Sequence, residues 1–179
     1  HGSLGAFLWR YEPPASRRPD QVTRAWLSGT PKTDDSATLA KDLKKLGKVD
    51  LVMITHGHGD HIGDSVAIAK MNGAKIVLNA DMGRTFATNG WISMKQLVRI
   101  NKSGPVKPIG DGITITMVRA EHSSEVVYTD SGGKMGMEPG GEPAGYIIKL
   151  EDGYTIYHAG DTGVFGDMKF IAEFYKPDV

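Results

Sequence analysis

The sequence has 179 residues, 40% of them hydrophobic and 23% charged, which is ordinary for one soluble globular domain with its own core. Lysine plus arginine number 21, as do aspartate plus glutamate. The charge is balanced, so the sequence shows no excess of positive charge that would indicate binding to nucleic acid or an anionic membrane. No apolar run approaches the ~20 residues that span a bilayer, and without cysteine any metal site must use His, Asp and Glu.

Strand and helix patterns alternate along the chain, which predicts an α/β protein. Continuous apolar, β-branched runs indicate strands buried on both faces, and Gly47 and Gly73 stand where glycine commonly ends a helix. Residues 12–35 are predicted to be irregular. The predicted elements are, in chain order, a helix over 37–46 with Ser36 as N-cap, a strand over 49–55, a helix over 64–73, a strand over 74–80, a mainly helical stretch over 81–101, strands over 112–120, 144–150 and 154–160, and a helix over 167–175.

Residues 129–143, "TDSGGKMGMEPGGEP", contain five glycines and two prolines and are predicted to form a long loop between strands. The glycines raise the entropy cost of ordering, and no hydrophobic period offsets it. We therefore expect a mobile, glycine-rich active-site loop. Met135 and Met137 are apolar and flexible, as in an adaptable substrate wall.

The stretch "MITHGHGDHIGD", residues 53–64, holds half of the six histidines of the chain. Imidazole and carboxylate groups are the ligands that zinc accepts when thiolates are absent. Residues two apart in extended backbone point the same way, so His56 and His58 can bind one ion, while Asp60 and His61 can face a second. A solvated surface loop is the alternative. It is disfavoured because the spacing is particular and the loop leaves the end of a buried strand, where α/β folds place their sites.

The pattern His-x-His-x-Asp-His resembles the signature of the metallo-β-lactamase superfamily. Two later segments agree in order, each after a predicted strand: His122 in "AEHSS" and Asp161 in "YHAGDTG". The phrases "WLSGTPKT", "GGEPAGYII", "IYHAGDTGVFGDMK" and "YKPDV" are similar to the little-characterised metal-dependent hydrolases of that superfamily. The resemblance covers residues 27–179 and implies an αββα sandwich with the metals at one edge of the paired sheets.

The resemblance also implies a dinuclear metal site and a hydroxide between two zinc ions, since zinc lowers the pKa of bound water towards neutrality. The implied ligands are His56, His58 and His122 for the first zinc, Asp60 and His61 for the second, and Asp161 as a bridge. Asp60 is also a catalytic candidate, because its carboxylate could orient the hydroxide and pass a proton to the leaving group. One or two zinc ions are expected, with Mn²⁺ or Fe²⁺ as alternatives.

The sequence departs from the family pattern at both ends. The family usually supplies one more histidine to the second zinc, on a strand beyond "YKPDV", and an Asp-Pro pair where Arg24 and Ala25 stand. We therefore expect a fragment, incomplete at both termini and lacking the final strand and helix elements of the fold. Alternatively, another subunit of a homo-oligomer supplies the missing edge elements.

Four further polar residues are candidates for roles near the metals. His158 is a candidate catalytic residue, and a packed histidine that hydrogen-bonds near the site is the favoured alternative. Asp64 suits the cap of the following helix. Ser123 and Ser124 lack the Gly-x-Ser-x-Gly context of a nucleophile, so we expect them to form hydrogen bonds that support the ligands.

Together these features predict one domain over residues 1–179 that acts as a zinc-dependent hydrolase. Its metal-bound hydroxide would attack an ester, lactone, amide or phosphodiester bond, and lactonase activity on a substrate such as an acyl-homoserine lactone is one candidate. The alternative is a metal-binding domain without turnover, because the last family ligand is absent. We expect a small-molecule substrate, no nucleic-acid or membrane partner, and a soluble protein of the cytoplasm or periplasm, since no signal peptide is visible.

Overall fold

The computed structural model describes residues 7–9 and 47–179. The predicted irregular segment 12–35 and the predicted helix over 37–46, with its cap at Ser36, lie outside these described residues. The strands are β1 (Phe7–Trp9), β2 (Leu51–Met53), β3 (Lys75–Asn79), β4 (Leu97–Ile100), β5 (Pro105–Val106), β6 (Ile113–Arg119), β7 (Glu125–Thr129), β8 (Met135–Pro139), β9 (Ala144–Leu150) and β10 (Thr155–His158). The helices are α2 (Gly59–Ile62), α3 (Ser65–Asn72), α4 (Ala80–Thr88) and α5 (Asp167–Tyr175).

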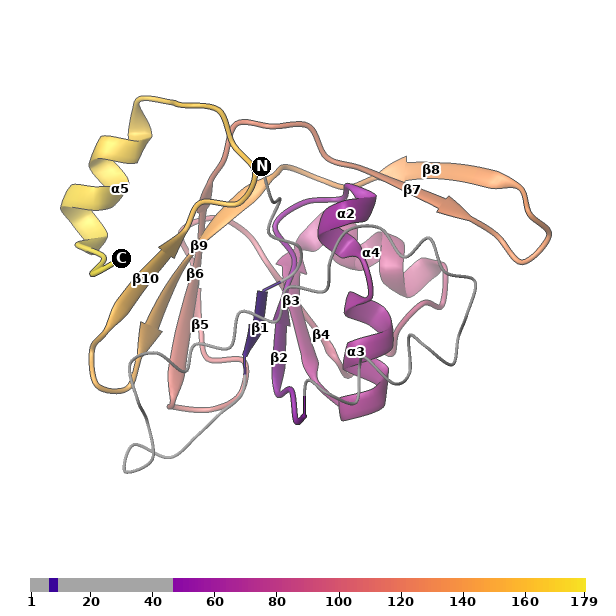
Figure 1. Cartoon of the computed structure of the whole chain (residues 1–179), viewed down its shortest axis with the longest axis horizontal. Coiled ribbons are helices and arrows are strands. Elements are labelled where there is room, and N and C mark those ends of the chain that lie inside the picture. The colour runs from indigo at the N-terminus through magenta and orange to yellow at the C-terminus, as the bar shows by residue number, and fades with distance from the viewer. Residues whose placement is uncertain (1–6, 10–46) are drawn as a thin grey trace.

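Two four-stranded sheets pack together between helices, so that the layers run helix, sheet, sheet, helix (Figure 1). The first sheet has the order β1-β2-β3-β4, with β2, β3 and β4 parallel to one another. The second has the order β10-β9-β6-β5 and is antiparallel throughout. Helices α3 and α4 cover the outer side of the first sheet and α5 lies against the second (Figure 1). This is the αββα arrangement that the family resemblance implies.

The apolar run at residues 49–55 contains β2 (Leu51–Met53), and its burial on both faces explains why it shows no polar alternation. Leu51 and Met53 point into the core between the sheets, where they join Tyr146 of β9. Val52 and Ile54 point to the other side, into the core beneath α3 and α4. Buried strands in the middle layers of such a sandwich need apolar residues at every position.

Sequence patterns located most of the elements. Strands β2, β3, β6, β9 and β10 and helices α3 and α5 confirm the predicted strands and helices in those stretches. Gly73 ends α3 in the left-handed conformation expected of a helix-ending glycine. Among the helices in the described part of the chain, none combines the length and apolar character needed to cross a membrane.

The prediction of a mainly helical stretch over 81–101 is wrong in its second half. Helix α4 ends at Thr88, Gly90 follows with a positive φ of 65°, and Leu97–Ile100 form β4. Strand β4 pairs in parallel with β3, in the register Ile76↔Leu97 to Asn79↔Ile100. The hydrogen-bonding edge of β3 therefore decides the conformation of a short stretch whose own pattern is ambiguous between helix and strand.

The prediction that residues 129–143 form a long irregular loop is also wrong. Strands β7 and β8 pair antiparallel from Glu125↔Pro139 to Thr129↔Met135 and form a separate two-stranded hairpin. The Asp130 side chain accepts hydrogen bonds from the backbone N–H groups of Gly132 and Lys134, both at 2.9 Å, and so holds the turn. Cross-strand backbone hydrogen bonds order this glycine-rich segment, and the other end of the hairpin is fixed by Val126, which is buried in the core.

Candidate metal centre

The candidate metal ligands come from loops that leave three different strands at one edge of the two sheets. In each case a ligand follows the last strand residue by three positions: His56 after Met53, His122 after Arg119, and Asp161 after His158. Strand β2 belongs to the first sheet, and β6 and β10 belong to the second. Packing of the two sheets therefore brings together ligands that are distant in sequence.

The histidine loop continues from β2 into the short helix α2. His58 is the N-cap residue of α2, and Asp60 and His61 lie within the helix. Its glycines matter at one close contact: a Cβ atom on Gly57 would lie 2.8 Å from the backbone carbonyl carbon and oxygen of Glu125. Only glycine therefore lets this loop pack directly against the start of β7.

The side chains form two overlapping groups whose ligand atoms lie within 4.8 Å of one another. One group is His56, His58 and His122, and the other is His56, His61 and Asp161. The Asp161 carboxylate connects the two: its Oδ2 atom lies 3.6 Å from Nε2 of His61 and 3.5 Å from Nε2 of His122. The Asp161 carboxylate is therefore within reach of histidines from both groups.

Hydrogen bonds orient the first two imidazole rings. Nδ1 of His56 lies 3.0 Å from Oγ1 of Thr55, which leaves Nε2 directed into the cluster. Nε2 of His58 lies 3.1 Å from Oγ of Ser123 and 3.3 Å from Oε2 of Glu125, which leaves Nδ1 for the cluster. The two inward-facing nitrogens are 3.1 Å apart. Such partners of the outer ring nitrogen fix the tautomer and orientation of metal-binding histidines.

The cluster fits a divalent metal ion because it contains buried histidine nitrogens that no protein group hydrogen-bonds within the described residues. Among the described residues, both ring nitrogens of His61 are buried without a hydrogen-bond partner. A buried polar atom left this way costs free energy unless something else satisfies it. Burial, followed by the neighbouring His61 and His58, lowers the pKa of His56 from 6.5 to about 3. Neutral imidazole, the form that binds metals, is therefore favoured.

Asp60 and His158, the two predicted catalytic residues, have different surroundings. Oδ2 of Asp60 lies 3.6 Å from Nε2 of His61, so the exposed carboxylate borders the cluster, although it belongs to neither group of close ligand atoms. His158 ends β10, its Nδ1 accepts the backbone N–H of Gly160 at 3.2 Å, and it too belongs to neither group. The assignments of metal ligands and catalytic roles stay predictions.

The supporting roles expected of the two serines are confirmed. Ser123 contacts His58, and Oγ of Ser124 accepts the backbone N–H of Gly57 at 3.0 Å. Asp64 occupies the N-cap position of α3 as predicted, but its side chain makes no capping hydrogen bond, and burial raises its pKa. Sequence reasoning missed Thr55 and Glu125. Thr55 directly precedes His56, so its position in the sequence was a signal for the contact. Glu125 contacts His58, which lies 67 positions earlier, and no local sequence pattern links the two residues.

An αββα sandwich with a histidine and aspartate cluster at the edge of both sheets defines the metallo-β-lactamase fold. The chain belongs to the beta-lactamase superfamily, because the family profile described as "Beta-lactamase superfamily domain" matches residues 30–179. It is 46% identical to a protein of Polaromonas sp. named UPF0173 metal-dependent hydrolase, over 88% of this chain and 57% of that protein. The chain thus spans about half the length of the curated relatives it matches.

Solved structures agree with this fold. Igni18, described as a metallo hydrolase from the hyperthermophilic archaeon Ignicoccus hospitalis, superposes with a TM-score of 0.62 and 36% identity, over 84% of this chain and 55% of that chain. An isothiocyanate hydrolase from Delia radicum gut bacteria superposes with a TM-score of 0.53 over 76% of this chain and 49% of its own. At 23% identity, the second similarity concerns the fold alone.

Proposed function

We propose that the protein containing this chain is a zinc-dependent hydrolase of small molecules that cleaves an ester, lactone, amide or phosphodiester bond. The observation that carries the proposal is the convergence of four histidines and Asp161 on one edge, where both ring nitrogens of buried His61 have no hydrogen-bond partner among the described residues. The names of the relatives support the same reaction class, since they are called metal-dependent hydrolases.

A bound divalent ion would supply Lewis-acid activation of water and of the bond to be cleaved. The residues of this chain orient the candidate ligands and provide a group that can transfer a proton. Thr55, Ser123 and Glu125 orient the rings of His56 and His58 through their outer nitrogens. The exposed carboxylate of Asp60 is available to accept a proton at Oδ2 and to return it to the leaving group.

The substrate class that we favour is a small carbonyl compound, with a lactone such as an acyl-homoserine lactone as one candidate. The formal net charge of the chain is zero, so it lacks the basic surface excess on which binding to a phosphate backbone depends. Carbonyl substrates require no such excess, because a metal ion and one proton-transferring carboxylate are enough for their hydrolysis.

The test compares metal binding with hydrolysis on the same preparation. The chelator-treated protein is loaded with Zn²⁺, Mn²⁺ or Fe²⁺ and assayed against p-nitrophenyl acetate, γ-butyrolactone, an acyl-homoserine lactone and bis-p-nitrophenyl phosphate. We expect turnover of a carbonyl substrate that chelation abolishes and Zn²⁺ restores, and His58→Ala should lose both metal and turnover. Metal binding without hydrolysis of any substrate would favour the alternative, a metal-binding domain without turnover.

A further inference from the structure

One face of the β7–β8 hairpin carries an exposed apolar strip. Val127, Met135 and Met137 are 52%, 74% and 69% exposed, respectively. Val127 pairs directly with Met137, and Met135 pairs with Thr129. Cross-strand partners and residues two apart lie on one face of a ribbon, so the three side chains share what we call the outer face of the hairpin.

The opposite face of the hairpin is packed against the protein. Val126 is buried in the core beneath α3 and α4, and the Tyr128 ring contacts Trp91 with centroids 4.9 Å apart. A hydrogen bond of 3.1 Å from the Thr85 hydroxyl to the Pro139 carbonyl ties β8 to α4. The hairpin is therefore held on the body of the protein, and its outer face remains open to solvent.

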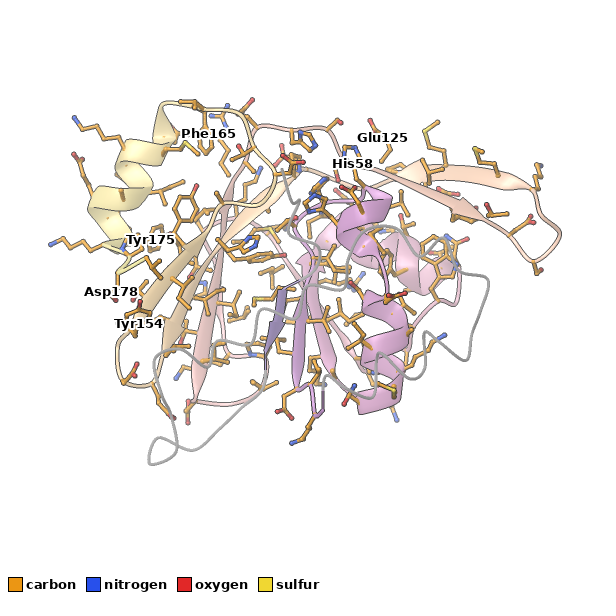
Figure 2. The ribbon with its side chains drawn as sticks, viewed as in Figure 1. His58, Glu125, Tyr154, Phe165, Tyr175 and Asp178 are labelled. Atoms are coloured by element: carbon orange, nitrogen blue, oxygen red, sulfur yellow. The ribbon has the colours of Figure 1, made fainter. Side chains whose placement is uncertain are left out.

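The outer face is continuous with the candidate metal centre. Glu125, the first residue of β7, belongs to this face, and its carboxylate contacts His58. Figure 2 shows both residues at the base of the hairpin, at the same edge of the molecule. At the usual rise per residue, the Val127–Met137 pair lies roughly 7 Å along the strand from Glu125, and Met135 roughly 14 Å.

We propose that the outer face binds the apolar chain of a substrate whose cleavable bond lies at the metal centre. The substrate class is then an ester, lactone or amide with an extended acyl or aryl group, and this inference rests on the proposed function. The apolar residues of the outer face follow one another along the ribbon, with Val127 and Met137 nearer to Glu125 and Met135 further from it. The six residues of this face include one charge, Glu125, which already contacts His58.

The size and chemistry of the strip favour a small ligand over a protein partner. A stable protein interface needs roughly 800 Å² on each partner, far more than three side chains provide. Two of the three are methionines, whose flexible and polarisable side chains adapt to apolar ligands of different shapes. The order of the hairpin also limits the entropy cost of binding, since its backbone is already hydrogen-bonded.

The experiment replaces Met135 and Met137 together by glutamine, which keeps the side-chain length but adds polarity. The matched control is Met71→Gln, an exposed methionine on α3 that is 46% accessible. Each zinc-loaded protein is assayed with p-nitrophenyl acetate and p-nitrophenyl octanoate. We expect KM for the octanoate to rise about tenfold in the double variant, with kinetics for the acetate unchanged and no effect in Met71→Gln. An unchanged KM for the octanoate would overturn the proposal.

A second measurement separates this proposal from the proposed function. Binding of the apolar dye N-phenyl-1-naphthylamine to the chelated protein needs no turnover, and it should weaken in the double variant. If neither these esters nor any substrate of the earlier panel is hydrolysed but the dye result holds, the proposed function fails and the apolar site stands. If the variant binds the dye like the parent, or if its only change is the loss of a dimer on a sizing column, the inference is wrong. Val127→Thr repeats the test should the double variant melt early.

Discussion

Oε2 of Glu125 lies 3.3 Å from Nε2 of His58, so the first residue of the β7–β8 hairpin contacts the histidine loop directly. The same junction is held by the hydrogen bond from Gly57 to Ser124. The hairpin therefore contributes to the orientation of a candidate metal ligand. A substitution at the base of the hairpin should then change metal binding by the histidine loop.

Replacing Glu125 by alanine should weaken metal binding although Glu125 belongs to neither group of ligand atoms. The carboxylate restrains the outer nitrogen of His58, and loss of such a partner typically lowers metal affinity by about tenfold or more. Competition with a chromogenic chelator measures the affinity for Zn²⁺. Glu138→Ala, on the same hairpin but on its opposite face, is the control and should bind like the parent. Equal affinities for all three proteins would remove Glu125 from this role.

Gly57→Ala should destabilise the protein and Gly59→Ala should not. A Cβ atom on Gly57 would meet the backbone of Glu125 at 2.8 Å, whereas one on Gly59 would meet nothing within 4 Å. Overpacking of this kind costs about 1–3 kcal/mol of the free energy of unfolding. Urea denaturation of both variants measures the difference. The same cost in both would contradict the close packing of the histidine loop on β7.

Asp60→Asn should lower kcat more than it lowers metal content. The exposed carboxylate borders the cluster without belonging to either group of close ligand atoms, and it is the proposed proton carrier. Loss of general acid–base catalysis typically costs about 100-fold or more in rate. Steady-state kinetics beside metal analysis tests this, with Asp64→Asn as a nearby control. A variant with unchanged kcat would exclude Asp60 from the mechanism.

The metal-free protein should lose stability as the pH falls below neutrality. The folded-state pKa of His56 is about 3, against 6.5 in the unfolded chain, and the pKa of His61 is lowered in the same direction. Above pH 6.5 both states are neutral and these residues contribute no pH dependence. Between pH 6.5 and about 3 these histidines bind protons in the unfolded chain, whereas His56 stays neutral in the folded chain. The free energy of unfolding therefore decreases as the pH falls.

Melting temperatures of the chelator-treated protein between pH 7.5 and 4.5 measure this effect. His56→Gln removes one of the responsible groups and should show a shallower decline. A decline as steep as that of the parent would mean that other groups dominate the pH dependence.

The sequence by itself determined the parts of this protein that depend on local patterns. Continuous apolar runs located the buried strands, because a strand covered on both faces needs apolar residues throughout. The spacing of His56, His58, Asp60 and His61 pointed to metal chemistry, because these side chains are neighbours along one short loop. The family signature added His122 and Asp161, and packing of the two sheets brings both to the same edge as the loop.

Only the tertiary structure decided the features that depend on contacts between distant segments. Strand β4 forms because β3 offers a free edge, and the hairpin forms because β7 and β8 satisfy one another's backbone groups; neither requires a distinctive hydrophobic period. Glu125 likewise reaches His58 only after β6 and β2 are placed in facing sheets. The hydrophobic periodicity of a sequence indicates which residues are buried. It does not record which distant backbone or side chain completes a hydrogen bond, and that is set when the sheets pack.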